Sequence, residues 1–571
     1  MNGDHNMQAE TSEKGKSGNL LLKIENALMS GKFSKIALIL LFAVLFAYGI
    51  SNVKEYGRSW DELEAITITH SNWIEYAIRL FPDGSSIKEN ALASDYTPIS
   101  VKFERDHGAA PFYFFLPFYK IYEEDRAGMA YAWHTYTFCL YFLSVVAVWF
   151  LLKELYGSKL VSTAGMLFYY FTPRFFAEGH YNDKDVIFMG LIMACALFAV
   201  RAAKKLSLKK KGVWADILIF SVLSGFMMNV KIIGIAIWGL MGLFTIIYVA
   251  TRGKDVKLGA WVKIVLTVLF SVIMYIALTP ASWAGIPDFL KFLFDNAFHY
   301  SGWYGFVRFR GTLFNPAEIG MPYSYLPTWM LITIPAYITI LFSLSVLSFA
   351  VTTVKERGKN IVKDDSDFFF LMLLIGFLTP FSLVVAKSHT EVFYNSWRHM
   401  YFLYAFMLPG ALYFPHKLLS GLKKDDSVKR KRIAELVYAL VTVAFLTCAG
   451  EMIANRSFEY VYYNPISRLI IDVNGYEGDY WMVSVVPALR EFADKYYDGE
   501  HPLKVACVLF ESHGAEAAML DENKIEFVAP EKADYLIYNP SGSYDWPEIE
   551  DHDKVFSINR FGVELTGIYA K

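Results

Sequence analysis

Long runs of apolar residues recur along this chain, separated by short polar segments. Each run has about the 20 residues that an α-helix needs to cross a hydrocarbon core of about 30 Å. We place eleven such spans near residues 36–53, 130–152, 159–176, 185–202, 213–230, 232–251, 260–280, 328–350, 367–386, 398–416 and 434–453. The pattern therefore predicts an all-α polytopic membrane protein with about 11 transmembrane helices.

The pattern changes after the last span. Short β-like runs at residues 503–510, 533–538 and 554–558 alternate with a helical stretch near residues 484–496. This alternation is typical of a small α/β domain outside the membrane. The expected organisation is a polar tail at residues 1–35, a transmembrane domain at residues 36–453 and a C-terminal α/β domain at residues 454–571.

Basic residues predict the orientation of the spans. Residues 201–211 contain six Lys or Arg and no acid, and residues 417–432 contain seven Lys or Arg with two Asp. The positive-inside rule assigns both segments to the cytoplasm. With an odd number of spans, the N-terminus is then cytoplasmic and the C-terminus extracytoplasmic. The long outer loops then fall at residues 54–129, 174–184, 281–327 and 387–397.

The first 35 residues are polar and lack the pattern of a cleaved signal, so residues 36–53 are expected to remain as the first span.

Composition excludes several functional classes. The residues are 55% hydrophobic and 19% charged, and a net charge of −2 with no basic domain argues against nucleic-acid binding. The sequence contains no P-loop or dinucleotide fingerprint, so chemistry on ATP is not expected. The histidines lack the close spacing of a helical zinc motif, and the four cysteines are expected to be packing residues. We predict neither a metal nor another cofactor.

Two adjacent acids, Asp61 and Glu62, follow the first span by a few residues. Charge at that depth is costly unless it faces water, a partner or a substrate. A carboxylate beside a dry cavity can be tuned to take the proton of an acceptor hydroxyl, which is a poor nucleophile until a base removes that proton. The alternative is an ordinary helix start, with the acids capping the helix or facing solvent.

Cations at the outer ends of the spans are the second feature. They include Arg58, Arg174, Lys184 and Arg398, at about the depth of lipid headgroups. Such groups suit a lipid-linked phosphate, which Arg grips through two hydrogen bonds. The alternative for each is contact with phospholipid headgroups by a long, flexible side chain. Lys231, in a short turn between two spans, has the same two interpretations.

Asp185 opens the span at residues 185–202, directly after Lys184. It is either a partner of the substrate-binding cations or an acid favoured by the helix dipole. The aromatic segment 299–304 suits stacking on a sugar or guiding a lipid.

One carboxylate base with nearby cations is a sufficient set for one reaction in particular. Cleavage of an ordinary glycosidic bond needs a second carboxyl group as an acid, because an alkoxide is a poor leaving group. A sugar that leaves a lipid phosphate needs no such acid, because the phosphate departs as a stable anion. Cations that hold the developing charge are enough.

These residues, in order, resemble the GT-C superfamily of membrane glycosyltransferases. The closer resemblance is to its protein O-mannosyltransferase and lipid A aminoarabinose transferase branch, in a bacterial, mostly uncharacterised subgroup. A bacterial subgroup implies a location in the plasma (inner) membrane, and an endoplasmic reticulum location would give the same topology. It covers roughly residues 36–485. The motifs that carry it are Asp61-Glu62, Pro173-Arg174, Asn182-x-Lys184-Asp185, Pro322 with Tyr325-x-Pro327, Arg398-His399, Tyr462-x-Asn464 and Asp479-Tyr480-Trp481.

The resemblance implies an inverting transfer of a sugar from a polyprenyl-phosphate donor on the extracytoplasmic side. It carries the catalytic carboxylate over to Asp61, with Glu62 beside it. The substrate-binding residues are then expected to be Arg58, His107, Arg174, Lys184, Asp185, Tyr325, Arg398 and His399. The chain lacks the sugar-binding repeats inserted in eukaryotic protein mannosyltransferases. This departure leaves a lipid, a glycan and a protein open as acceptors.

Two other functions compete with the glycosyltransferase. A transporter or lipid flippase typically has repeated halves and interrupted helices, with ionisable groups near the bilayer midplane. In this chain the ionisable residues gather at the span ends and the outer loops are long, which favours an enzyme. A scaffold that binds a partner through the C-terminal domain would leave the acids at residues 61–62 and 183–185 without a role.

Overall fold

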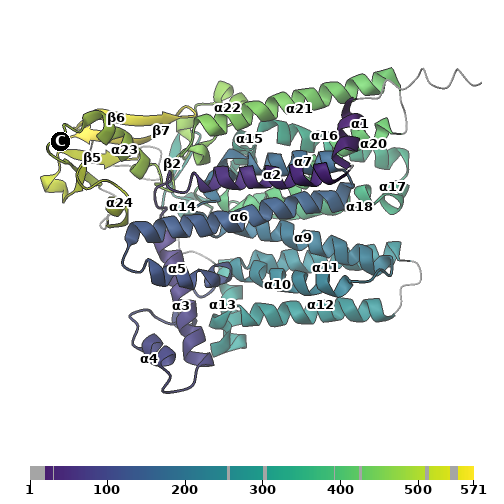
Figure 1. Cartoon of the computed structure of the whole chain (residues 1–571), viewed down its shortest axis with the longest axis horizontal. Coiled ribbons are helices and arrows are strands. Elements are labelled where there is room, and N and C mark those ends of the chain that lie inside the picture. The colour runs from purple at the N-terminus through teal and green to yellow at the C-terminus, as the bar shows by residue number, and fades with distance from the viewer. Residues whose placement is uncertain are drawn as a thin grey trace, which may run out of the picture.

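The computed structural model describes residues 20–29, 31–253, 258–299, 305–390, 393–423, 427–507, 514–539, 549 and 551–571. The long helices lie side by side in one bundle, and a small sheet domain sits at one end of it (Figure 1). We refer to this end as the sheet end of the bundle and to the opposite end as the basic end.

Eight helices in the described ranges are long and apolar enough to cross a membrane. They are α6 (Arg126–Tyr156), α9 (Asp185–Ser207), α10 (Val213–Val230), α11 (Ile233–Arg252), α12 (Leu258–Ala277), α16 (Ala336–Lys355), α18 (Asp365–Lys387) and α21 (Val428–Ala454). Runs of this length and hydropathy define an integral membrane protein.

The expected count of eleven spans is not confirmed, because three of the expected spans coincide with shorter or interrupted helices. These are α2 (Gly31–Ile50), in which the apolar stretch with described side chains is the shorter Ser34–Ile50, α7 (Lys159–Tyr170) followed by α8 (Pro173–Glu178), and a 3₁₀ helix (Arg398–Leu403) followed by α19 (Tyr404–Ala411) and α20 (Tyr413–Leu422). The predicted span at 328–350 is divided too, into α15 (Tyr325–Thr333) and α16.

Proline explains two of these interruptions. Pro173 and Pro335 stand directly before or at the start of a new helix. Proline lacks the N–H that an ongoing helix needs and disfavours helical geometry in the residue before it. An apolar run read from hydropathy alone does not register this break.

One helix at the sheet end runs across the bundle rather than along it. Helix α3 (Glu62–Leu80) crosses this end at a steep angle to the long helices, with α4 (Ser86–Leu92) and α5 (Leu116–Ile121) beside it (Figure 1). The later loop adds α13 (Ile286–His299), the antiparallel pair β1 (Val307–Phe309) and β2 (Thr312–Phe314), and α14 (Pro316–Ile319). Short 3₁₀ turns lie at Ile99–Val101, Ala110–Phe115 and Pro280–Ala284.

The C-terminal region forms the predicted α/β domain. Its sheet has the strand order β4-β3-β5-β7-β6. Strand β3 (Leu503–Cys507) pairs in parallel with β4 (Ile525–Phe527) and β5 (Tyr535–Tyr538), while β7 (Val563–Ala570) is antiparallel to β5 and β6 (Asp553–Arg560). Helix α23 (Val485–Tyr496) buries Leu489 and Phe492 in one core with residues of these strands.

The connection from α21 to this domain contains α22 (Pro465–Ile470) and short 3₁₀ turns at Glu459–Val461 and Val473–Gly475. The remaining short elements are α1 (Leu20–Met29), α17 (Lys359–Lys363), α24 (Gly514–Ala518) and a 3₁₀ turn at Pro530–Lys532.

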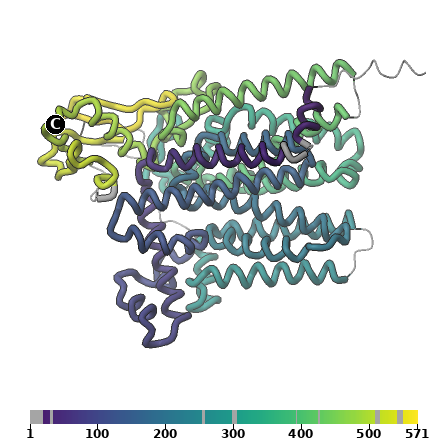
Figure 2. Tube along the Cα trace, in the orientation of Figure 1, coloured from purple at the N-terminus to yellow at the C-terminus, as the bar shows by residue number. Residues whose placement is uncertain are grey.

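The two ends of the bundle differ in the way the charge pattern predicts. The described residues of the basic connections, 201–211, 417–423 and 427–432, lie at the end opposite the C-terminal domain, as the trace of the chain shows (Figure 2). Helix α3 and the loops that carry the expected site residues lie at the sheet end. The segments that the sequence assigned to one side of a membrane are therefore on one side of this bundle.

Candidate active site

Asp61 stands directly before α3, and its side chain retains 36% of its exposure. Oδ2 accepts a hydrogen bond from Nη1 of Arg398 at 2.9 Å. Arg398 begins the 3₁₀ helix Arg398–Leu403 and retains 8% of its side-chain exposure. The packing of the bundle thus joins an acid from the first loop to a cation from the fourth, and the acid keeps a face open.

The same guanidinium approaches a second acid. Nη1 of Arg398 lies 3.9 Å from Oδ2 of Asp185, the first residue of α9. Asp185 also forms an ion pair with Lys231, which follows the last residue of α10. Asn182 holds Asp185 in place, because its Nδ2 donates to the Asp185 carboxylate at 3.2 Å and its Oδ1 accepts from the Asp185 N–H at 2.8 Å. Arg398 therefore lies between two carboxylates.

Lys184 adds a third cation to the cluster formed by Asp61, Asp185, Arg398 and Lys231. Its ammonium makes no hydrogen bond or ion pair with any residue that the structure describes, although its charge acts on Asp61. Burial raises the pKa of Asp61, but the charges of Arg398 and Lys184 outweigh burial and hold that pKa below its ordinary value. Asp61 is thus a carboxylate that stays ionised, beside an ammonium group that is free to take another anion.

Glu62 has a different environment from its neighbour. It is 1% exposed, and Oε1 accepts hydrogen bonds from the N–H of Ser59 at 2.8 Å and from Nε2 of His134 at 3.0 Å. The Ser59–Glu62 contact ties the backbone that leads into α3 to the first residue of that helix. Glu62 therefore faces the bundle interior and fixes the turn that presents Asp61.

Aromatic rings hold the Arg398 guanidinium. Its central carbon lies 4.6 Å from the ring centroid of Trp481 and 5.3 Å from that of Tyr394. The backbone before it is strained, since Asn395 and Ser396 both have positive φ, at 56° and 60°. Such strain persists where surrounding contacts impose it, and it gathers at functional sites.

Glu477 provides one of those contacts. It is fully buried, and Oε2 accepts hydrogen bonds from the Ser396 N–H at 2.8 Å and from the hydroxyl of Tyr325 at 3.2 Å. Tyr325 thus supports the loop that carries Arg398, two contacts away from it.

Arg174 lies in the interior of the bundle and is 1% exposed. Nη2 donates to the carbonyl oxygen of Tyr462 at 3.4 Å, and Nε and Nη1 are buried without a hydrogen bond. Its charge interacts with Glu178, whose carboxylate accepts from the hydroxyl of Tyr401 at 2.6 Å and from Asn182 at 2.7 Å. Arg174 is therefore connected to the cluster only through neighbouring polar side chains.

The other expected residues are distributed around the cluster. Arg58 donates to Glu516 of α24 at 3.1 Å, which ties the first loop to the C-terminal domain. His107 contacts its neighbour Asp106 at 3.1 Å. His399 packs edge-on against Tyr394, and its Nε2 is buried without a hydrogen-bond partner. Of these three, only His399 lies against the Arg398 loop.

The aromatic segment at 299–304 falls almost entirely outside the described residues. Among the described residues, no three His, Cys, Asp or Glu side chains are grouped so that they could hold a metal ion.

Sequence reasoning did not single out Trp481, Glu477 or Asp183 as site residues. Trp481 belongs to the quoted Asp479-Tyr480-Trp481 motif, and the motif was the available signal for it. Glu477 lies two residues before that motif, and Asp183 lies within Asn182-x-Lys184-Asp185. For Glu477 and Asp183 the available signal was that each is an acidic residue beside or within a quoted motif.

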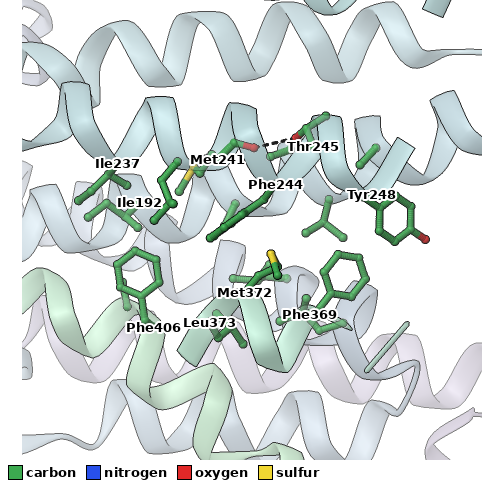
Figure 3. A pocket seen from close by; sticks show the side chains of 18 of the residues that line it. Ile192, Ile237, Met241, Phe244, Thr245, Tyr248, Phe369, Met372, Leu373 and Phe406 are labelled. Carbon is green, nitrogen blue, oxygen red and sulfur yellow. Dashed lines mark hydrogen bonds between the residues drawn. The ribbon is translucent and has the colours of Figure 1, made fainter. Parts of the chain in front are cut away.

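An apolar pocket lies between helices of the bundle, and one of these helices is α9, which begins at Asp185. Figure 3 shows side chains from α9, α11, α18 and α19 around it, among them Ile192, Ile237, Met241, Phe244, Phe369, Met372 and Phe406. The polar groups drawn there are few, and Thr245 directs its hydroxyl to the carbonyl oxygen of Met241 in its own helix. The pocket is suited to a hydrocarbon chain and unsuited to a polar ligand.

The described residues thus define an integral membrane protein with a carboxylate–guanidinium centre at the sheet end of its bundle. The sequence matches no protein-family model and no curated protein. Two solved structures have similar folds at low identity. The oligosaccharyltransferase of Archaeoglobus fulgidus, crystallised with a tethered acceptor peptide, is 11% identical, with a TM-score of 0.42 over 87% of this chain and 69% of that one. ArnT from Cupriavidus metallidurans, bound to undecaprenyl phosphate, is 12% identical, with a TM-score of 0.39 over 94% of this chain and 98% of that one. Both similarities are weak.

Proposed function

We propose that this protein is a membrane glycosyltransferase that moves a sugar from a polyprenyl-phosphate donor to an acceptor hydroxyl. The observation that carries the proposal is the position of Arg398, 2.9 Å from Asp61 and 3.9 Å from Asp185, with the unpaired ammonium of Lys184 nearby. An acid and several cations at one site are what transfer from a lipid phosphate requires.

The cations hold the phosphate in this mechanism. The Lys184 ammonium can bind the phosphate without giving up another partner. Arg398 keeps its hydrogen bond to Asp61 and offers its other N–H groups to the phosphate. Arg398 is suited to the task because its Nε is buried without a hydrogen-bond partner, so an incoming oxyanion would satisfy it. Lys231 supports the arrangement by neutralising Asp185.

Asp61 takes the proton of the acceptor hydroxyl as the hydroxyl oxygen attacks the anomeric carbon. The bond from that carbon to the phosphate oxygen breaks, and polyprenyl phosphate leaves as an anion beside Arg398 and Lys184. Attack from the face opposite the leaving group inverts the anomeric configuration. Glu62 contributes by fixing the turn before α3, through its contacts with Ser59 and His134.

The apolar pocket gives the prenyl chain a path. It is lined by Ile192 of α9, seven residues after Asp185, or about 10 Å along a helix that rises 1.5 Å per residue. Helix α11, which begins two residues after Lys231, lines the pocket as well. A hydrocarbon chain attached to a phosphate in the cation cluster can therefore extend along α9 and α11.

The test uses purified full-length protein in liposomes with polyprenyl-phosphate donors that carry a radiolabelled hexose or pentose. Extracts of membrane lipids, glycans and proteins serve as acceptors. We expect the label to pass to one acceptor class, with release of polyprenyl phosphate, and we expect Asp61→Asn to reduce transfer at least about 1,000-fold. Asp288→Asn, at an exposed helix start on the same end of the bundle, is the matched control. Full transfer by the Asp61→Asn variant would refute the assignment.

A transporter remains the competing function. It predicts movement of a labelled lipid between the leaflets of these liposomes without formation of a new glycosidic bond, and the same preparation measures both.

A further inference from the structure

Asp183 is an unusual carboxylate. It is 7% exposed, and among the described residues it has neither a hydrogen bond nor an ion pair. Buried carboxylates are normally paired or hydrogen-bonded, because removing an isolated charge from water is costly. Asn182 and Asp185, in the same turn, have the partners that Asp183 lacks.

The surroundings make its ionisation still less favourable. The charged groups that act on Asp183 are Asp61 before α3, Glu62 at the start of α3, Asp185 at the start of α9, and Lys184 beside it. Three of these four are acids. Only Lys184 favours the charged form of Asp183.

The turn that carries Asp183 is held firmly. Asn182 donates to Glu178 at 2.7 Å, and its Oδ1 accepts from the N–H groups of Lys184 at 3.3 Å and Asp185 at 2.8 Å. These contacts fix the backbone on both sides of Asp183. The fold keeps this acid, which has no hydrogen-bond or ion-pair partner in the described ranges, close enough to Asp61 for the two charges to interact.

We infer that Asp183 is a second proton-carrying residue of the active site, which receives the acceptor's proton from Asp61. This inference rests on the proposed function. In the step, the hydroxyl O–H bond breaks as its oxygen bonds to the anomeric carbon, and the proton goes to Asp61. The proton then moves to ionised Asp183, directly or through one water molecule, and from there to solvent. The phosphate oxygen keeps the electron pair of the broken glycosyl bond.

The proton affinities of the two acids give this transfer its direction. Arg398 and Lys184 hold the pKa of Asp61 below its ordinary value, so Asp61 is a poor final holder of a proton. Burial, followed by the three neighbouring acids, raises the pKa of Asp183 to about 7. A proton on Asp61 therefore moves to Asp183 with a gain in free energy, and Asp61 returns to its ion pair with Arg398.

The first experiment measures the pH dependence of transfer by the full-length wild type and Asp183→Asn. In the wild type, kcat should rise through a midpoint near pH 7, because Asp183 must be ionised to accept a proton. In Asp183→Asn, we expect kcat at pH 8 to fall about 100-fold with the donor KM changed less than twofold, and the midpoint near pH 7 to disappear. Asp288→Asn should retain the wild-type profile. An Asp183→Asn variant that keeps the midpoint, or keeps kcat within twofold, would overturn the inference.

The second experiment needs no catalysis and so separates this inference from the proposed function. Because the folded-state pKa of Asp183 is raised, its contribution to stability is present at low pH and is lost as the pH rises through about 7. The thermal midpoint of the wild type should therefore fall between pH 6 and pH 9 by more than that of Asp183→Asn. An equal fall in both proteins would show that Asp183 carries no proton at neutral pH. If the wild type transfers no sugar while the two midpoints differ, the proposed function fails and the protonation of Asp183 stands.

Discussion

Nη1 of Arg398 and Oδ2 of Asp61 lie 2.9 Å apart, although 337 residues separate them along the chain. The pair closes the site across the sheet end of the bundle. Under the proposed function both residues also act on the substrate. Asp61 and the donor phosphate therefore compete for the Arg398 guanidinium. Under the proposed function, the donor phosphate would draw on the same guanidinium, weaken its hold on Asp61 and so raise the basicity of that carboxylate.

Replacing Arg398 should affect the donor more than the acceptor. Loss of a charge-assisted hydrogen bond costs about 1.5–3 kcal/mol, so Arg398→Ala should raise the donor KM about 10- to 100-fold. Arg398→Lys should be intermediate, because an ammonium group keeps the charge without the planar fork. Initial rates at varied donor and acceptor concentrations measure this. Arg560→Ala, at an exposed ion pair with Glu491, is the control. A rise confined to the acceptor KM would contradict the assignment.

Substitutions of Glu62 and Asp61 should have different effects, the first mainly on stability and the second on transfer. Glu62→Ala leaves Ser59 N–H and His134 without their buried acceptor, which should reduce the free energy of unfolding by about 1–3 kcal/mol. Glu62→Gln retains an acceptor oxygen and should lose less stability and only part of the activity. Thermal unfolding in detergent, measured beside the transfer assay, tests both statements. A Glu62→Gln variant that is as inactive as Asp61→Asn, with unchanged stability, would instead give Glu62 a direct chemical role.

Trp481 should matter through the guanidinium it covers. A desolvated cation–π contact contributes about 2 kcal/mol, so Trp481→Ala should raise the donor KM about 10- to 30-fold. Trp481→Phe keeps an aromatic face and should have a smaller effect. Trp214→Ala, in an exposed position near the basic end, serves as the control. Equal donor KM values for the Ala and Phe variants would exclude a cation–π contribution.

Arg58 either binds the donor phosphate or holds the C-terminal domain in place. Comparing a substitution of Arg58 with one of its partner Glu516 distinguishes the two roles. The ion pair with Glu516 predicts that Arg58→Ala and Glu516→Gln have the same effect, a faster cleavage of the C-terminal domain by added protease. The double variant should be no worse than either single one. If Arg58 binds the donor phosphate, Arg58→Ala alone will raise the donor KM.

The orientation of the bundle is open to a labelling test. The positive-inside rule predicts that single cysteines at Asp95 and Glu531 react with an impermeant maleimide added to intact cells. A cysteine at Lys209, in the basic connection after α9, should react only after the membrane is permeabilised. All three positions are exposed, whereas Cys195, Cys448 and Cys507 are buried and Cys139 is half-buried within α6. Labelling of Lys209→Cys alone in intact cells would reverse the orientation and remove the proposed site from the outer face.

The sequence by itself determined the membrane character of the chain, because long apolar runs have few stable alternatives to a membrane-spanning helix. It also indicated which short motifs carry charge at the span ends, and it predicted the small α/β domain from the change in periodicity after residue 453. Hydropathy did not reveal the helix breaks at Pro173 and Pro335, since a sum over apolar residues ignores backbone geometry.

Only the tertiary structure decided how the charged residues divide their tasks. Asp61 and Glu62 are equivalent in the sequence, but His134 draws Glu62 inward and Arg398 meets Asp61 at an open surface. Asp183 and Asp185 are equally ambiguous until Lys231 is seen to pair with Asp185 and leave Asp183 alone. The reason is physical: the state of an ionisable group depends on its depth and on which charges packing brings near it, and those charges come from distant parts of the chain.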